Sequence, residues 1–331
     1  MQEFIIFTII LALFFDFING FHDSANAIST VVATKVLTPI RAVGMAAVGN
    51  LIGPLFFSTA IAATIGKGII KIDGVASDIL VTLIFSALVG AIIWDLITWY
   101  IGLPTSSSHA LVGGLVGGGL AALGSGYINP SGVEKVVVFM VVSPIVGMAA
   151  AFILTTIVIR VFYRVSPTRI NRYFRSLQLF SAFFYSVTHG TNDAQKTMGI
   201  ITVLLVAYGS LTTFAVPLWV ILAAHISISL GTFFGGWRIV KTMAQKITKL
   251  RPYQGFCAET SGGLVLASMA ALGVPVSTTH VISSSIMGVG ATDKLSAVRW
   301  GIARKIVGAW VLTIPVSALM SFLTYQIITA F

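Results

Sequence analysis

The chain has 331 residues, of which 56% are hydrophobic and only 9% are charged, and its mean hydropathy is +0.98. Soluble domains carry about 25% charged residues, so this composition indicates a polytopic membrane protein with no room for a soluble domain. The formal net charge of +10 comes from basic residues in the hydrophilic connections between apolar stretches. That distribution is typical of positive-inside topology and gives no reason to expect nucleic-acid binding.

Six apolar stretches approach or exceed the length of about 20 residues that a helix needs to cross about 30 Å of hydrocarbon. In chain order they cover residues 5–15, 42–64, 79–101, 136–159, 216–234 and 306–328. No small-residue cleavage site marks the first stretch as a removed signal peptide, so we expect it to be retained as a span. A single cysteine, Cys257, excludes an intramolecular disulfide and a thiolate metal cluster, and we expect it to pack in the interior.

A short polar string lies inside the first long apolar segment. Residues 19–23 read NGFHD, near the middle of residues 4–34, and we expect a helix break at Asn19-Gly20, with two half-helices meeting at the membrane midplane. An aspartate at membrane depth costs about 2.5 to 3.5 kcal/mol and usually faces a cavity where it has a function. Asp23 and Asn26 lie three residues apart, on one helical face.

A related string, HGTND, recurs at residues 189–193, so that Asp193 follows Asp23 by 170 residues. We expect a second helix break there, and Lys196 repeats the spacing of Asn26. Carboxylate, carboxamide and freed carbonyl oxygens are hard ligands that suit sodium or a divalent cation. The sequence therefore predicts a cation site, with sodium held by four residues: Asp23, Asn26, Asn192 and Asp193.

A second motif is also duplicated. Residues 103–109 read LPTSSSH and residues 274–280 read VPVSTTH. Proline suits a first helical turn and Ser or Thr suits an N-cap, so each string predicts a helix start whose free N–H groups and dipole favour an anion. The apolar segments that follow, 110–123 and 281–290, are shorter than a span and predict half-helices or re-entrant hairpins. The hydroxyls expected to surround a tetrahedral oxyanion are those of Thr105, Ser106, Ser107, Ser108, Ser277, Thr278 and Thr279.

Loops at equivalent positions of the two halves carry different charge. The basic connection at residues 238–251 corresponds to 67–78, where the charges balance, and the basic loop at 291–305 corresponds to the nearly uncharged 120–135. The two halves are therefore predicted to insert in opposite orientations, as in secondary transporters that bind their substrate at the repeat interface. We expect a first repeat at 1–160, a basic cytoplasmic connection at 161–177 and an inverted second repeat at 178–331, with both termini outside.

Electrostatics constrains the mechanism of such a site. Two ionised aspartates and a doubly charged oxyanion in one low-dielectric cavity would repel one another strongly. Cations or protons must therefore accompany the anion, which predicts cotransport.

The motif at residues 190–193 and both Pro-to-His strings resemble those of the inorganic phosphate transporter (PiT) family. Its repeats carry Gly-x-Asn-Asp-like motifs followed by Pro-x-Ser-(Ser/Thr)-(Ser/Thr)-His strings, and the resemblance covers essentially the whole chain. The first copy departs from the pattern, with His22 where the family usually has asparagine. The resemblance implies a phosphate symporter driven by sodium in many members and by protons in others, with paired half-helix motifs at the site, and it suggests a homodimer.

Other polar residues of the apolar segments allow more than one interpretation. Glu259 lies inside a span and indicates a cation or proton site, whereas Asp95 is expected to pair with a neighbour. Gln195 or Lys196 could reach an oxyanion, although Lys196 could instead extend to the membrane interface. His109 and His280 are expected to be packing residues.

Three classes of function follow from these observations. The favoured one is an all-α transporter in the plasma (inner) membrane, built from inverted repeats, that imports phosphate with sodium by alternating access. Coupling to protons or a metal is the nearest variant, and no resident cofactor is expected. A cation channel or exchanger using the paired aspartates is the second class. An intramembrane hydrolase with Ser107 or Thr278 as nucleophile is the third, and the duplication argues against an enzyme.

Overall fold

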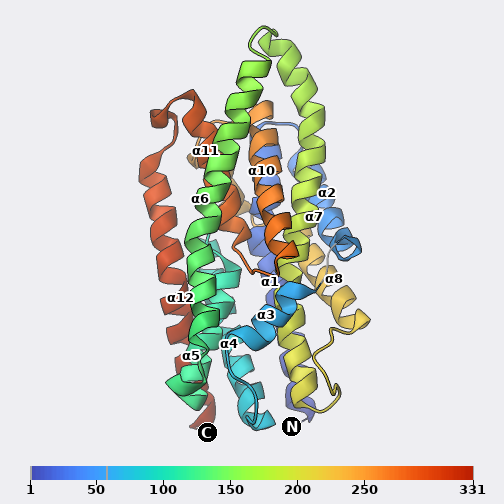
Figure 1. Ribbon diagram of the computed structural model, residues 1–331, viewed down its shortest axis with the longest axis vertical. Coiled ribbons are helices and arrows are strands. Elements are labelled where there is room, and N and C mark those ends of the chain that lie inside the picture. The colour runs from blue at the N-terminus through green and yellow to red at the C-terminus, as the bar shows by residue number, and fades with distance from the viewer. Residues whose placement is uncertain (1, 57–58, 331) are drawn as a thin grey trace.

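The computed structural model describes residues 2–56 and 59–330, and these residues form helices throughout, with no strand beyond one isolated bridge. The expected all-α class is confirmed (Figure 1). In chain order the helices are α1 (Gln2–Ala33), α2 (Pro39–Ile52), α3 (Ala60–Gly68), α4 (Ser77–Ile101), α5 (Ser107–Leu123), α6 (Pro130–Val161), α7 (Pro167–Ala207), α8 (Leu218–Phe234), α9 (Trp237–Lys246), α10 (Pro252–Ala271), α11 (Thr278–Asp293) and α12 (Trp300–Thr329).

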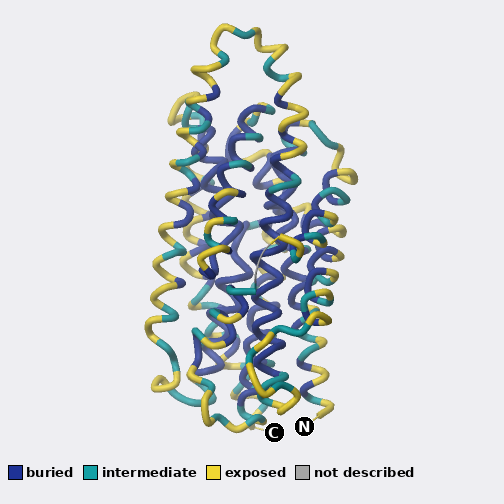
Figure 2. The backbone as a smooth tube through the Cα atoms, turned by 45° about the vertical axis from the view of Figure 1, so that its right-hand side comes forward, coloured by how far each residue is buried: buried dark blue, intermediate teal, exposed yellow. Residues whose placement is uncertain are grey.

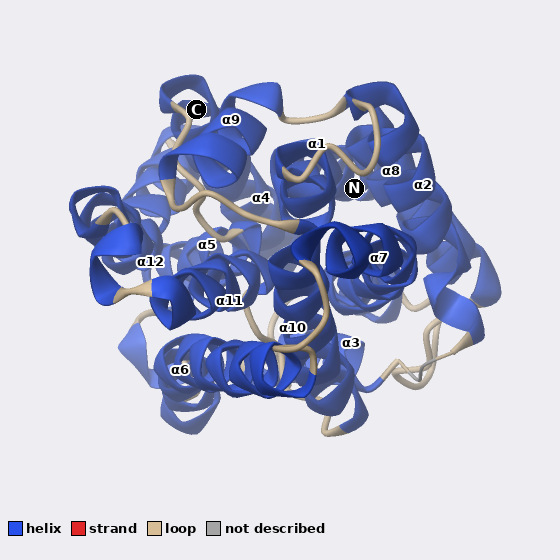
Figure 3. Ribbon diagram, turned by 90° about the horizontal axis from the view of Figure 1, so that it is seen from above, coloured by secondary structure: helices blue, strands red, loops and turns tan. Residues whose placement is uncertain are grey.

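Four of these helices, α1, α4, α6 and α12, are long and apolar enough to cross a membrane. The pairs α2–α3 and α8–α9 are also apolar enough, but each pair is bent. Figure 2 shows buried backbone in the middle of the bundle and exposed backbone along its outer helices. Viewed from above, α1, α7, α10 and α11 lie toward the middle, while α6, α12, α2 and α8 lie nearer the outside (Figure 3).

The expected helix breaks at the two aspartate motifs are wrong, because α1 and α7 each run through their motif without interruption. The glycines of these motifs permit close packing against neighbouring helices. A Cβ added at Gly20 would lie 2.9 Å from the carbonyl carbon of Ile228 on α8. One added at Gly190 would lie 2.5 Å from the Cα of Asn50 on α2.

The span expected over residues 42–64 does not form one continuous helix. Helix α2 ends at Ile52, a short 3-10 turn covers Gly53–Leu55, and α3 begins at Ala60. Pro54 lies in that turn and has no N–H to continue a helix, which explains why an apolar run of span length does not form one helix. A second bend, of 66°, separates α8 from α9, and there Gly235 adopts a φ of +73° that favours glycine.

The helices α5 and α11 each form a hairpin with the helix before them, as expected for re-entrant elements. The α4–α5 hairpin returns to the end of the molecule where Lys71 N donates to Tyr127 O at 2.8 Å. The α10–α11 hairpin returns to the other end, where Arg299 N donates to Ile247 O at 3.0 Å. Figure 1 shows α5 low and α11 high, both chain termini at the bottom, and the α6–α7 connection at the top.

The basic connections gather at the α6–α7 end. Arg251 lies in a groove with residues of the α6–α7 connection, Arg299 donates to Gln245 O at 3.2 Å, and Arg175 donates to Lys35 O at 2.8 Å. The other end carries Lys71 on a connection that also contains acidic residues. The bundle therefore has one strongly basic end and one nearly balanced end.

The close packing of α7 on α2 yields a first prediction. Gly190→Ala would place a methyl group against the backbone of α2, and overpacking of this kind typically costs about 1–3 kcal/mol. We expect a lower midpoint of thermal unfolding for the detergent-solubilised protein. The matched control is Gly44→Ala on α2, where nothing lies within 4 Å of the added Cβ, so its midpoint should be unchanged or higher. Equal midpoints for both variants would contradict this account of the motif glycine.

Candidate functional site

The two hydroxyl-rich strings begin helices as expected. Ser106 is the N-cap of α5 and its Oγ accepts a hydrogen bond from His109 N at 3.3 Å. Ser277 is the N-cap of α11 and accepts from His280 N at 3.1 Å. The prolines of both strings lie two residues before these caps, so their expected place in the first helical turn is wrong. Each proline instead holds the chain extended as it approaches the cap.

The N-terminus of α11 packs against the polar face of α1. Asp23 Oδ2 accepts from Thr279 Oγ1 at 3.2 Å and from Thr278 Oγ1 at 3.4 Å. Asn26 Nδ2 donates to Thr279 Oγ1 at 2.9 Å, while its Oδ1 is buried without a partner. The structure thus brings together the carboxylate and carboxamide of the first motif and two hydroxyls of the second string.

Asp193 of α7 joins the same cluster. Its Oδ2 lies 3.1 Å from Thr278 Oγ1 and 3.2 Å from His189 Nε2, and its Oδ1 contacts the ammonium of Lys196. Thr278 therefore lies between two carboxylates, although its single hydroxyl proton can be donated to only one of them at a time. Ligand atoms of Asp23, His189 and Asp193 all lie within 4.8 Å of one another.

The tip of the α4–α5 hairpin closes the other side of the cluster. His22 Nδ1 lies 2.7 Å from Asp23 Oδ1, and its Nε2 lies 3.1 Å from Thr98 Oγ1. Thr105 Oγ1 donates to Thr98 Oγ1 at 2.8 Å. Ser108 Oγ, in the first turn of α5, contacts Lys196 Nζ. The α10–α11 tip therefore contacts both aspartates directly through Thr278. The α4–α5 tip is linked to them only through His22 and Lys196.

Some of the expected site residues take other positions. Gln195 Oε1 accepts from Ile61 N at 2.9 Å, and its Nε2 donates to Thr191 O at 3.0 Å. Both ends of its amide are thus used outside the cluster, and its expected contact with an oxyanion stays a prediction. Glu259 accepts from Gln178 Nε2 at 3.0 Å and contacts Ser181 Oγ. It forms a separate polar group between α10 and α7.

Two expected ligands keep an oxygen free. Ser107 Oγ and Asn192 Oδ1 are buried and have no hydrogen-bond partner among the described residues. The amide nitrogen of Asn192 is used structurally, because it donates to Thr188 O at 2.8 Å and to Leu266 O at 3.2 Å. These oxygens are available to a ligand of the cluster.

Neither buried carboxylate oxygen of Asp95 has a hydrogen-bond partner among the described residues, so its expected pairing with a neighbour stays a prediction. Asp16 also has no partner for either carboxylate oxygen, and neither repeated motif predicted a role for it. The signal was present, since Asp16 lies seven residues before Asp23, two turns away on the same face of α1. Tyr185, whose hydroxyl donates to Thr278 O at 3.0 Å, carried no such signal.

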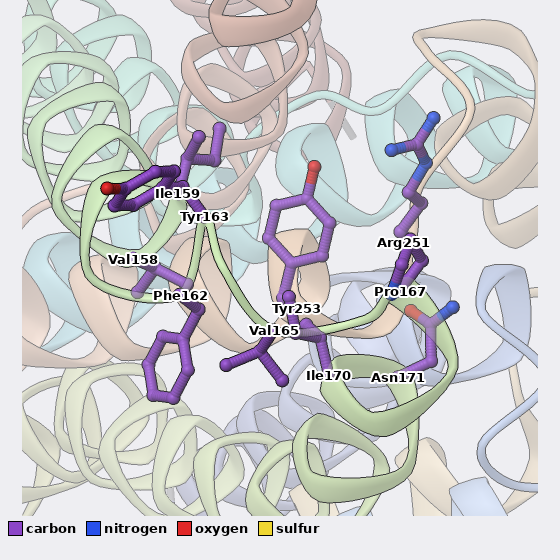
Figure 4. A pocket seen from close by; sticks show the side chains of 10 residues that line it. All are labelled: Val158, Ile159, Phe162, Tyr163, Val165, Pro167, Ile170, Asn171, Arg251 and Tyr253. Atoms are coloured by element: carbon purple, nitrogen blue, oxygen red, sulfur yellow. The ribbon is translucent and has the colours of Figure 1, made fainter.

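The cluster is closed to solvent. No expected site residue exceeds 6% exposure, and Figure 2 shows the middle of the bundle as buried. The groove in Figure 4 lies elsewhere, at the α6–α7 end, and has a volume of about 440 Å³ with Tyr163, Arg251 and Tyr253 among its lining residues. The molecule is therefore in a conformation that occludes the polar cluster from both ends.

The charges of the interior do not balance. Five acidic residues are buried, namely Asp16, Asp23, Asp95, Asp193 and Glu259, whereas Lys196 is the one buried lysine or arginine among the described residues. Two buried histidines, His22 and His189, also lie against Asp23 and Asp193. Buried carboxylates that lack a partner become protonated or bind cations, because an unpaired charge in a low dielectric is costly. The arrangement can therefore take up positive charge, and its helix N-termini can bind an anion.

Comparison with known proteins gives consistent matches along the whole chain. The sequence profile described as "Phosphate transporter family" matches residues 19–168 and 163–321. A "Probable low-affinity inorganic phosphate transporter" of Rhizobium meliloti (strain 1021) is 53% identical over 318 residues, which are 96% of this chain and 94% of that protein. A protein of the same description from Bacillus subtilis (strain 168) is 45% identical over 325 residues, or 98% of this chain and 96% of its own.

The fold also matches a solved structure. A protein described as "The sodium-dependent phosphate transporter" superposes with a TM-score of 0.90 and 25% sequence identity, covering 99% of this chain and 100% of its own. The polytopic helical architecture is therefore shared with a transporter.

The caps of the half-helices yield a second prediction. Ser277→Ala removes the acceptor of His280 N, and loss of an N-cap costs about 1 kcal/mol. We expect the midpoint of thermal unfolding in detergent to fall. Ser277→Gly is the matched control, because glycine at an N-cap costs only a few tenths of a kcal/mol, so its midpoint should stay close to that of the wild type. If alanine were tolerated as well as glycine, Ser277 would not be acting as a cap.

Proposed function

The chain belongs to the phosphate transporter family, and we propose that it imports inorganic phosphate by symport with cations, sodium first among them. The observation that carries this proposal is the meeting of two half-helix N-termini with the aspartates of α1 and α7 in one buried cluster. Membership in this family assigns transport and not catalysis, in agreement with the expectation that the protein is not an enzyme.

Phosphate is proposed to bind at the N-termini of α5 and α11. Backbone N–H groups at a helix start have no intrahelical partner, and the helix dipole favours negative charge there. Ser107 offers a free hydroxyl at the first residue of α5, and Thr278 holds the corresponding place in α11. Hydroxyl and backbone donors carry no permanent charge, so they can release phosphate as well as bind it.

Cations are proposed to bind at the oxygens of Asp23, Asn26, Asn192 and Asp193. The free Oδ1 atoms of both asparagines support this assignment, because sodium prefers several oxygen ligands of this kind. Positive charge at the carboxylates also reduces their repulsion of a phosphate dianion. The solved neighbour that is described as sodium-dependent favours sodium over protons or a metal as the first ion to test.

Alternating access is proposed to arise from the two hairpins. The α4–α5 and α10–α11 hairpins return to opposite ends of the bundle, and the order of helices α1–α6 corresponds to that of α7–α12. Both facts support inverted repeats that open the cluster to one side at a time. The basic end is proposed to face the cytoplasm, which leaves both termini outside. The homodimer suggested by the family resemblance stays a prediction.

The proposal is tested by uptake of radiolabelled phosphate into proteoliposomes that contain the purified protein. An inward sodium gradient should drive accumulation above the external phosphate concentration, and sulfate should not be accumulated. Accumulation driven only by a proton gradient would replace sodium by protons within the same scheme. Absence of accumulation under either gradient, with a sodium leak that does not depend on phosphate, would favour a cation channel.

Removal of either motif carboxylate should abolish gradient-driven accumulation. Asp23→Asn and Asp193→Asn keep the side-chain size but remove the negative charge that attracts positive charge to the cluster, whether a mobile cation or the Lys196 ammonium. We expect accumulation to fall to the level of protein-free liposomes while both variants still insert and elute as folded protein. The control is Asp73→Asn, in an exposed connection. Wild-type accumulation in both motif variants would remove the carboxylates from the mechanism.

The free hydroxyl of α5 yields a separate prediction. Ser107→Ala should raise the KM for phosphate about tenfold, because a hydrogen bond to a charged ligand contributes about 1.5–3 kcal/mol. Ser143→Ala on α6 is a matched control, since Ser143 Oγ is also buried without a partner but is not among the site residues. Similar KM values for the two variants would leave Ser107 without a role in phosphate binding.

A further inference from the structure

The two aspartate motifs differ at one equivalent position. On α1, Asp23 is followed three residues later by Asn26, and on α7, Asp193 is followed at the same spacing by Lys196. Residues three apart share a helical face, so both pairs face the cluster. The first repeat presents a carboxamide where the second presents an ammonium.

Lys196 lies entirely within the bundle. Its side chain is 1% exposed, whereas every other lysine and arginine of the described residues is exposed. The interpretation that it extends to the membrane interface is therefore wrong. Its Nζ contacts Asp193 Oδ1 and Ser108 Oγ, so the ammonium lies between a proposed cation ligand and a proposed phosphate ligand.

The corresponding position in the first repeat is Asn26, which carries no ammonium group. Asp23 contacts His22, Thr278 and Thr279. Asn26 directs its Nδ2 to threonine hydroxyls and leaves Oδ1 without a partner. In the first repeat, Asn26 Oδ1 is therefore open to a cation, and Asp23 is contacted by an imidazole and two hydroxyls and by no lysine. In the second repeat, the Lys196 ammonium already occupies one oxygen of Asp193.

We propose that Lys196 is a tethered cation that replaces a mobile coupling ion at Asp193. A sodium ion at that carboxylate would compete with an ammonium held three residues away on the same helix, and the tether gives the ammonium a large advantage in effective concentration. The mobile cation that accompanies phosphate then binds on the Asp23–Asn26 side. This inference rests on the proposed function. It states that residue 196 determines how many mobile cations are carried with each phosphate.

The test replaces Lys196 by the residue of the other repeat. Lys196→Asn restores the Asp-x-x-Asn arrangement in α7, and we expect it to create a second sodium site. Proteoliposomes are loaded at equal pH on both sides, and uptake of labelled sodium and labelled phosphate is measured together. The number of sodium ions carried per phosphate should increase by one relative to the wild type. If the wild type is driven by protons, the variant should gain sodium uptake that the wild type lacks.

A second readout does not require transport. A ligand that binds only the folded state stabilises it. Sodium chloride should therefore raise the thermal unfolding midpoint of Lys196→Asn in detergent more than that of the wild type. Choline chloride is the salt control. Lys196→Arg is the matched control, since it keeps the charge and should keep the sodium response of the wild type. The sodium titration is interpretable even if the wild type moves no phosphate, an outcome that would overturn the proposed function alone.

Two results would overturn the inference. One is a sodium response and a sodium-to-phosphate ratio in Lys196→Asn that equal those of the wild type. The other is a rise in the KM for phosphate without a change in that ratio, which would make Lys196 a phosphate ligand that acts with Ser108.

Discussion

Negative charge buried in the middle of the bundle is the constraint on which the rest of the structure depends. Five carboxylates lie in the interior, where Lys196 is the one lysine or arginine among the described residues and His22 and His189 lie against the motif aspartates. Buried negative charge is costly unless protons, cations or helix N-termini supply positive charge. A ligand anion increases the need for positive charge. Binding of the anion and binding of the cation are therefore linked by electrostatics, and this linkage is what a symporter requires.

Close packing between helices positions the buried aspartates next to one another. Gly20 and Gly190 bring α1 and α7 against the backbones of α8 and α2, so both aspartate-bearing helices stay continuous and hold their carboxylates at fixed depth. The two hairpins then present helix starts to these carboxylates from opposite sides, and Thr278 contacts both aspartates. Because one hydroxyl lies between the two carboxylates, a shift of α11 would change the environment of both together.

The sequence predicted the helical class, the two helix starts and the gathering of both aspartates, because each depends on local chemistry or on a repeated pattern. The sequence-based predictions were wrong where the position of a residue depends on packing between helices. The motif glycines suggested broken helices, but their role is visible only once Ile228 and Asn50 are known to lie against them. Gln195 follows Asp193 closely in the chain, yet its amide turns to Ile61, a contact that spacing along one helix cannot reveal. Lys196 was expected near an anion or the interface, and its contact with Asp193 depends on the depth of α7 within the bundle.

The central claim is that phosphate and cations bind to the cluster as linked ligands. The most direct measurement is equilibrium binding of phosphate to the detergent-solubilised protein across a series of sodium concentrations and pH values at constant ionic strength. Linkage requires the phosphate affinity to rise with sodium or with protons, and the affinity for that cation to rise equally with phosphate. A phosphate affinity that depends on neither would contradict the account, because the anion would then bind without the positive charge that the buried carboxylates demand.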